Sequence, residues 1–120
     1  MKKQLDTVDQ EFIQWAIDKL GLESRPRVTV SDDHEKAKRH KAMGYYDPAE
    51  NIIWTLRGSR VKADWYRTLG HELVHWRQRE KGQELDGGDG SDCENEANST
   101  AAVLLREFGR DHPEIYSVPI

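Results

Sequence analysis

The sequence contains a single cysteine, Cys93, so no disulfide can form within the chain. It has no apolar run long enough to span a bilayer, and its N-terminal residues, MKKQLDTVDQEF, lack the apolar segment of a signal peptide. These absences argue against a disulfide-rich secreted domain and against a membrane-spanning protein. We therefore expect a protein of the reducing cytoplasm with no membrane partner.

An excess of positive charge is also missing. The chain has 18 Lys and Arg against 22 Asp and Glu, and its formal net charge is −4. Such a molecule as a whole repels nucleic acid and anionic membranes, so we expect neither as a partner. Residues 36–41 are a basic exception, which we interpret as a solvated face, with a local phosphate contact as the alternative.

The chain has 120 residues, the size of one domain, and we expect residues 1–120 to form a single folded unit. Its hydrophobic fraction is 36% and its charged fraction 33%, but four Trp, four Tyr and two Phe supply apolar area that disordered chains lack. A domain of this size buries only about two-thirds of its unfolded surface. A bound metal would therefore add to stability as well as to chemistry.

Hydrophobic periodicity and turn residues predict a mixture of helices and strands. Helices are expected at residues 8–20, 61–81 and 91–108, and strands at 26–30, 42–46 and 52–56, the last two as a hairpin. Gly21 and Gly109 are expected to end the first and last helices. Residues 32–41 should form a loop or a short helical turn, residues 82–90 a loop, and residues 112–116 an irregular tail. The mixture predicts an α+β domain.

The segment His71-Glu-Leu-Val-His75 lies in the middle of the helix predicted at residues 61–81. Residues four apart project from the same helix face, so both imidazoles can bind one metal ion. Glu72 lies about 100° further round the helix, beside the metal rather than on it. From there its carboxylate can take a proton from metal-bound water, so Glu72 is the expected general base.

A catalytic zinc needs three protein ligands and one open position. No third histidine follows His75 at short spacing, so a glutamate of the next predicted helix is favoured, Glu94 or Glu96. His112 is a more distant candidate.

Glu94 is the first choice, because Asn98 lies one turn further on and is placed to accept a hydrogen bond from a ligating histidine. A competing interpretation places Glu94 in a capping box with Ser91, where its side chain would bond the Ser91 backbone. Both Glu94 and Glu96 therefore remain candidates for the third metal ligand.

Other polar and aromatic residues are assigned less specifically. An oxyanion donor is expected, and the sequence does not choose among His112, Tyr116, Tyr45 and Tyr46. Arg67 and Gln78 are expected at the surface. The core is expected to include Trp54 and the apolar stripe Trp65, Leu69, Leu73 and Trp76.

His71-Glu-Leu-Val-His75 followed by Glu94-Asn-Glu-Ala-Asn98 resembles the glutamate-zincin (gluzincin) pattern, HExxH and then ExxA with Asp or Asn. It is similar to the minimal metallopeptidases of the ImmA/IrrE kind. Together with Phe108-Gly-Arg-Asp-His-Pro-Glu114 it also resembles small uncharacterised metallopeptidases of tailed bacteriophages. The resemblance covers roughly the last half of the chain.

The resemblance implies a zincin-like minimal metallopeptidase domain, in which a small antiparallel or mixed sheet packs on the HExxH helix and the following helix carries the third ligand. In such folds the edge strand ahead of the active helix holds the substrate, and residues 52–56 would be that strand. ImmA-like proteins carry FAxxLLMP where this chain has Thr100-Ala-Ala-Val-Leu-Leu105 and no Met-Pro. Their repressor-cleaving role is therefore not expected here.

The implied function is zinc-dependent hydrolysis of a protein or peptide substrate, in the cytoplasm of a bacterial or phage-infected cell. His71, His75 and Glu94 would bind Zn²⁺, and Glu72 would activate a zinc-bound water. The alternative is a zinc-binding interaction or anti-host module without catalytic turnover. An enzyme acting on DNA-attached proteins through the basic run at residues 36–41 is a third possibility.

Overall fold

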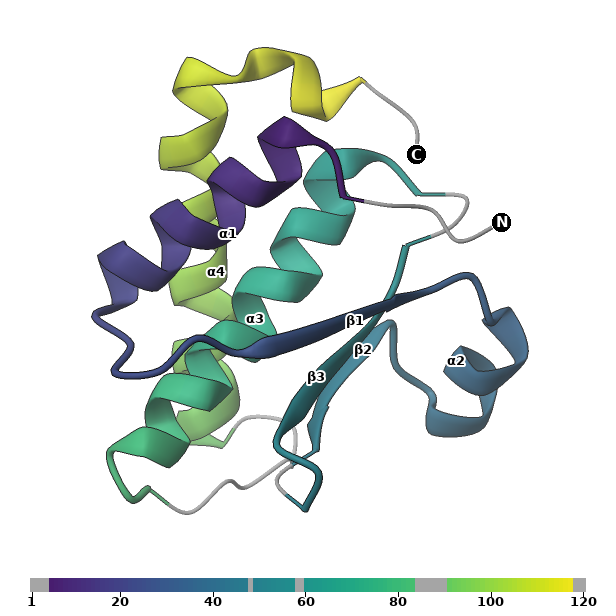
Figure 1. The fold of residues 1–120 in the computed structure, drawn as a ribbon, viewed down its shortest axis with the longest axis vertical. Coiled ribbons are helices and arrows are strands. Elements are labelled where there is room, and N and C mark those ends of the chain that lie inside the picture. The colour runs from purple at the N-terminus through teal and green to yellow at the C-terminus, as the bar shows by residue number, and fades with distance from the viewer. Residues whose placement is uncertain (1–4, 48, 58–59, 84–90, 118–120) are drawn as a thin grey trace.

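The computed structural model describes residues 5–47, 49–57, 60–83 and 91–117. Its helices and strands follow one another along the chain as α1 (Thr7–Leu20), β1 (Arg27–Ser31), α2 (His34–His40), β2 (Gly44–Asp47), β3 (Ile52–Leu56), α3 (Lys62–Glu80), α4 (Asp92–Asp111) and a 3-10 helix η1 (Pro113–Tyr116) (Figure 1). The expected α+β class is confirmed. None of the described helices is long and apolar enough to cross a membrane.

The sheet is mixed, with the strand order β1-β3-β2. β1 pairs with β3 in parallel, with Val28 opposite Ile53, and β2 pairs with β3 antiparallel, with Tyr45 opposite Trp54. The expected hairpin is thus confirmed, but the placement of residues 52–56 at an edge is wrong. β3 is the central strand because β1 pairs with one of its sides and β2 with the other. Four of the five residues of β3 are buried. β2 forms the edge.

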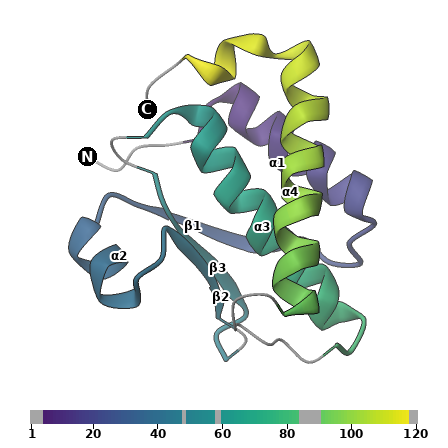
Figure 2. The same cartoon turned by 180° about the vertical axis from the view of Figure 1, so that it is seen from behind.

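Helix α3 links the sheet to the other long helices. It packs against β2 and β3 and against α1 and α4, which lie together on the other side of α3 from the sheet (Figures 1 and 2). The predicted stripe on α3 is buried throughout, and Trp54 on β3 is buried as well. α3 is therefore the central element of the core, and its HExxH segment lies between the sheet and α4.

The ends of α1 and α2 follow from local hydrogen bonds. Asp6 and Asp9 form a capping box at the start of α1, and Gly21 ends that helix with a φ of 66°, as predicted. Of the two alternatives predicted for residues 32–41, the helical one is confirmed, since His34–His40 form α2. Asp33 caps this helix by accepting a hydrogen bond from the backbone N–H of Lys36.

The predicted end of the last helix at Gly109 is wrong, since α4 continues to Asp111. Gly109 serves packing instead, because a Cβ atom at this position would lie 2.4 Å from the hydroxyl oxygen of Tyr116. The tail expected to be irregular forms η1, with Pro113 in its first turn. Most of the loop predicted at residues 82–90 lies outside the described residues.

Candidate metal centre

The two histidines of the HExxH segment face one another on α3. His71 Nε2 lies 3.1 Å from His75 Nε2, and the two rings are nearly perpendicular. This follows from their spacing of four residues, which places both side chains on one helix face. His75 is buried and His71 is half-buried, so the pair lies at the boundary between the core and the solvent.

Glu94 approaches both histidines from the first turn of α4. Its Oε1 lies 3.2 Å from His71 Nε2 and its Oε2 lies 2.7 Å from His75 Nε2. One ligand atom from each of the three residues lies within 4.8 Å of the others, which is close enough to hold a metal ion. Ser91 caps α4 by accepting from the Glu94 backbone N–H at 3.2 Å, but the Glu94 carboxylate is turned to the histidines.

Glu96, the other glutamate that the sequence left open, is placed differently. Its Oε1 accepts from Gln78 Nε2 at 2.7 Å, and its Oε2 lies 3.9 Å from Arg77 Nη2. His112 is also elsewhere, with its ring stacked on Phe108 and its Nε2 3.1 Å from Glu11 Oε2. The structure therefore brings Glu94, and neither of the other two candidates, to the histidine pair.

Gln78 was expected at the surface, but it is buried and holds His75 in position. Its Oε1 lies 2.8 Å from His75 Nδ1, while its Nε2 donates to the Cys93 carbonyl at 3.1 Å and to Glu96. An amide oxygen only accepts, so Nδ1 of His75 carries the proton and Nε2 keeps its lone pair for a metal. The spacing of three residues from His75 could have identified Gln78.

Replacing Gln78 by alanine should weaken metal binding by about 10- to 100-fold, because His75 loses the acceptor that sets its tautomer and ring orientation. A chelating dye that competes for Zn²⁺ would measure the dissociation constant. Gln10→Ala, on the exposed face of α1, is the matched control and should bind zinc like the wild type. An unchanged dissociation constant in a folded Gln78→Ala protein would contradict this role.

The second histidine has its own polar neighbour, Asn98, whose side chain acts to raise the pKa of His71. Asn98 lies one turn beyond Glu94 on α4, which is the relation predicted from the sequence. Burial and the charge of His75 lower the pKa of His71, against the opposite effect of Glu94 and Asn98. The neutral imidazole that a metal requires is therefore the favoured form of His71.

Glu72 is buried beside this group of residues, with 5% of its surface exposed. Burial and the neighbouring Glu94 carboxylate raise the pKa of Glu72 to about 8, and a hydrogen bond from the Tyr46 backbone N–H acts against this rise. A carboxyl group with a pKa near neutrality is suited to accept and release a proton. A nearby cation would favour its ionised form.

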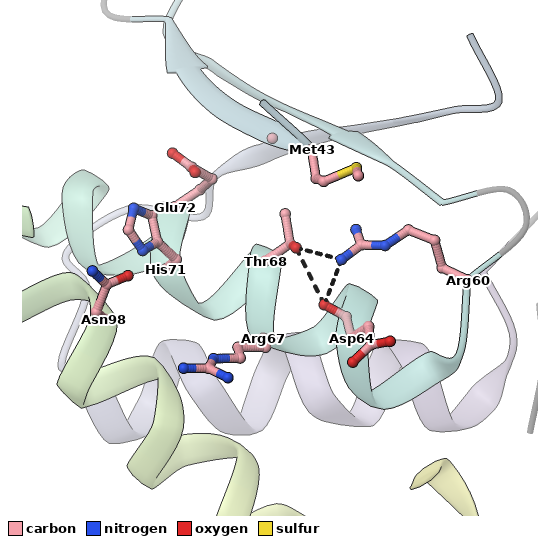
Figure 3. A pocket seen from close by; sticks show the side chains of 9 residues that line it. Met43, Arg60, Asp64, Arg67, Thr68, His71, Glu72 and Asn98 are labelled. Atoms are coloured by element: carbon pink, nitrogen blue, oxygen red, sulfur yellow. Dashed lines mark hydrogen bonds between the residues drawn. The ribbon is translucent and has the colours of Figure 1, made fainter. Parts of the chain in front are cut away.

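A pocket of about 300 Å³ opens in front of His71 and Glu72 (Figure 3). Its other lining residues come from α3, from the residues before α3, from the start of β2 and from α4: Met43, Gly44, Arg60, Asp64, Arg67, Thr68 and Asn98. Arg67 is exposed, as expected, but it lines the pocket. Arg60 had no predicted role.

The side chains proposed from sequence as oxyanion donors are engaged elsewhere in the described structure. The Tyr46 hydroxyl donates to Asn51 at 3.0 Å, Tyr45 stacks on Trp54, and the Tyr116 hydroxyl donates to the Leu105 carbonyl at 3.4 Å. Neither these side chains nor that of His112 lines the pocket that holds His71 and Glu72. The donors that do line it include Arg60, Arg67, Thr68 and Asn98.

Comparison of the chain with protein-family models, with curated proteins and with solved structures finds no match.

Proposed function

We propose that the protein is a minimal zincin-like metallopeptidase that hydrolyses peptide bonds with zinc held by His71, His75 and Glu94. The observation that carries the proposal is the convergence of these three side chains next to a pocket that His71 and the buried Glu72 line. Two imidazoles and one carboxylate, with an adjacent glutamate, are the donor set and base of glutamate-type zinc peptidases.

The spacing of the donor atoms supports zinc as the metal. With metal–ligand bonds of about 2.0–2.1 Å, the corners of a tetrahedral zinc site lie about 3.3–3.4 Å apart. The separations in the structure are 3.1 Å between the two Nε2 atoms, and 3.2 and 2.7 Å from these atoms to the carboxylate oxygens. The residues present therefore fit the ion, with only small movements of the side chains.

In the proposed mechanism, Glu72 accepts a proton from the attacking water and passes it to the leaving amine. Zinc, when bound, would lower the pKa of water to about 7 and polarise the scissile carbonyl. Gln78 holds the imidazole of His75, while Asn98 and the Tyr46 backbone N–H lie beside His71 and Glu72. Asn98, which lines the pocket, is a neutral donor available to a developing oxyanion.

The edge strand β2 is the surface against which an extended substrate would lie. Met43 O accepts from Leu56 N at 2.7 Å, so in the alternating pattern of an antiparallel pair the backbone groups of Gly44 point away from β3. Gly44 also lines the pocket, and a Cβ atom there would lie 2.7 Å from Thr68 Cγ2. A glycine at this position lets the strand edge approach the HExxH helix closely.

A zinc-binding module without turnover is the competing function, and it would call for a fourth protein ligand in place of water. Glu96 and His112, the other candidate ligands in the sequence, are bonded to Gln78 and Glu11 instead. An open pocket in front of His71 and Glu72 supports the hydrolytic proposal over this alternative.

The direct test is hydrolysis of denatured casein or of a mixed peptide library. We expect cleavage by the zinc-loaded protein, loss of cleavage after the metal is stripped with a chelator, and recovery when Zn²⁺ is restored. Peptide products resolved by mass spectrometry would show the bonds that are cut. Zinc-loaded, folded protein that leaves both substrates intact would contradict the peptidase proposal.

A further inference from the structure

The pocket beside His71 and Glu72 contains two arginines whose charges the proposed hydrolysis does not require. Arg67 lies one helical turn before His71 on α3, and Arg60 lies just ahead of that helix (Figure 3). Both side chains line the same pocket as the general base. Two carboxyl groups, those of Asp64 and Glu72, line the pocket as well.

Arg60 is fixed in place by neutral acceptors. Its Nη1 donates to the Leu56 carbonyl at 3.0 Å, and its Nη2 donates to the Asp64 carbonyl at 2.9 Å and to the Thr68 hydroxyl at 2.8 Å. These bonds hold the guanidinium group at the pocket before any ligand arrives (Figure 3). Among the described residues Arg60 forms no close ion pair, and the Asp64 carboxylate attracts it only at longer range, so the guanidinium group can still bind an anion.

Arg67 is exposed, and within the described part of the chain it forms no hydrogen bond or ion pair. The pocket has two carboxyl groups of its own, but neither is paired with these arginines. Glu72 accepts from the Tyr46 backbone, and the Asp64 carboxylate forms no ion pair with Arg60 or Arg67. Two guanidinium groups thus line the pocket without a close ion pair in the described structure, and Asp64 attracts only Arg60, at longer range.

We propose that Arg60 and Arg67 bind a carboxylate of the peptide substrate next to the bond that is cut. This inference rests on the proposed peptidase function and specifies its substrate class. The carboxylate belongs either to an acidic side chain or to the C-terminus of the peptide, since both present the same two oxygens to a guanidinium group. Arg60 and Arg67 are specificity residues in this proposal.

A second pocket next to the first is also suited to an acidic peptide. Met43 separates the pocket from a second one of about 370 Å³, which Lys38 and Lys41 of the basic run also line. The remainder of this second pocket includes the apolar side chains of Ala37, Ala42 and Leu56. Basic side chains around an aliphatic floor suit a peptide with acidic and apolar residues better than a nucleic acid, whose bases need stacking surfaces.

Binding without turnover tests the proposal separately from catalysis. The probes are fluorescein-labelled octapeptides that differ only in two central residues, Glu-Glu, Gln-Gln or Lys-Lys, all with an amidated C-terminus. A fourth probe is the Gln-Gln peptide with a free C-terminal carboxylate. Fluorescence anisotropy with zinc-loaded Glu72→Gln protein should show about tenfold tighter binding of the Glu-Glu or free-carboxylate probe than of amidated Gln-Gln. Which of the two binds tighter identifies the source of the carboxylate.

Arg67→Ala should reduce this preference to less than about threefold, because the exposed arginine is lost without disturbing the core. Arg106→Ala is the matched control, since Arg106 is an exposed arginine on α4 that does not line the pocket. Arg60 is a less suitable variant, because its hydrogen bonds tie β3 to α3.

Equal binding of the charged and uncharged probes, or a preference that survives Arg67→Ala, would overturn the proposal. The proposal would also be overturned if the protein bound a 12-nucleotide single-stranded DNA more tightly than any of the peptides and Arg67→Ala abolished this DNA binding. A carboxylate preference that depends on Arg67 would support the site even if no peptide were ever cleaved, and in that case only the peptidase proposal would fail.

Discussion

Replacing Glu72 by glutamine should lower peptide hydrolysis by about 10²- to 10⁴-fold and leave zinc bound. Glutamine has nearly the same shape as glutamate and keeps an oxygen that can accept from the Tyr46 backbone N–H. It cannot accept the proton of the attacking water. The rate constant for cleavage of a fluorogenic peptide, measured at saturating substrate, would show the loss, and zinc content would be determined on the same samples.

The Glu72→Gln variant should also remain folded, which separates lost chemistry from lost structure. Glu72 is buried, and a carboxyl whose pKa is raised on folding destabilises the folded state at pH values above its unfolded pKa. At pH 7 the metal-free protein must take up a proton at Glu72 on folding, and glutamine removes this cost, so the melting temperature of the variant should be unchanged or higher. Glu107→Gln, a substitution on the outer part of α4, is the control and should retain full activity. Equal cleavage by the Glu72→Gln and wild-type proteins would refute the role of Glu72 as base.

Replacing Asp9 by alanine should destabilise the protein by about 3–5 kcal/mol, the largest effect on folding that we expect. The Asp9 side chain is fully buried and accepts hydrogen bonds from the Tyr66 hydroxyl at 2.6 Å and from Arg57 Nη2 at 2.5 Å. Lys62 Nζ lies 3.4 Å away, and the Asp6 backbone N–H donates to the same carboxylate. Alanine would remove this counter-charge from the buried Arg57 and leave Lys62 paired with Asp6 alone.

Urea unfolding monitored by tryptophan fluorescence would measure the change in the free energy of unfolding. Asp9→Asn keeps the size of the side chain and should fall between alanine and the wild type. Asp18→Ala on the same helix is the control, because Asp18 is exposed and its change should stay within about 0.5 kcal/mol. A loss below about 1 kcal/mol for Asp9→Ala would show that the buried ionic group contributes little to stability.

The parts of the fold that could be predicted are those that depend on short-range patterns. The stripe from Trp65 to Trp76 identified the face of α3 that is buried, and the left-handed conformation of Gly21 ends α1 as its position suggested. The same periodicity could not predict strand order. β1 and β3 are distant in sequence, and their parallel pairing makes the hairpin strand at residues 52–56 central rather than an edge.

The candidate site likewise has parts that the sequence could predict and parts that depend on tertiary contacts. Helical spacing alone brings His71 and His75 together, and the relation of Glu94 to Asn98 on one face of α4 favoured the glutamate that the structure places at the histidines. Gln78 and Asp9 were not foreseen in their observed roles. Each is a polar residue buried by tertiary contacts, and a propensity-based interpretation assigns such residues to the surface.

Arg60 was missed for a related reason. Its role depends on three acceptors contributed by β3 and α3, Leu56, Asp64 and Thr68, which meet only when the strand and the helix are packed. At Gly109 the local rule was misleading. Glycine usually ends a helix, but here it lies within α4 and is required because Tyr116 packs closely against it. Local sequence patterns predict single helices and strands, but the side chains of the site are positioned by tertiary contacts between these elements.

The central claim is that His71, His75 and Glu94 hold zinc, and zinc content per chain in two glutamate variants tests it most directly. Purified wild-type, Glu94→Ala and Glu96→Ala proteins would be loaded with Zn²⁺, dialysed and analysed by inductively coupled plasma mass spectrometry. We expect about one zinc per chain in the wild type and in Glu96→Ala, and little in Glu94→Ala, since a site with only two histidines loses its charged ligand. Full zinc occupancy in folded Glu94→Ala, or its loss in Glu96→Ala alone, would contradict the proposed metal centre.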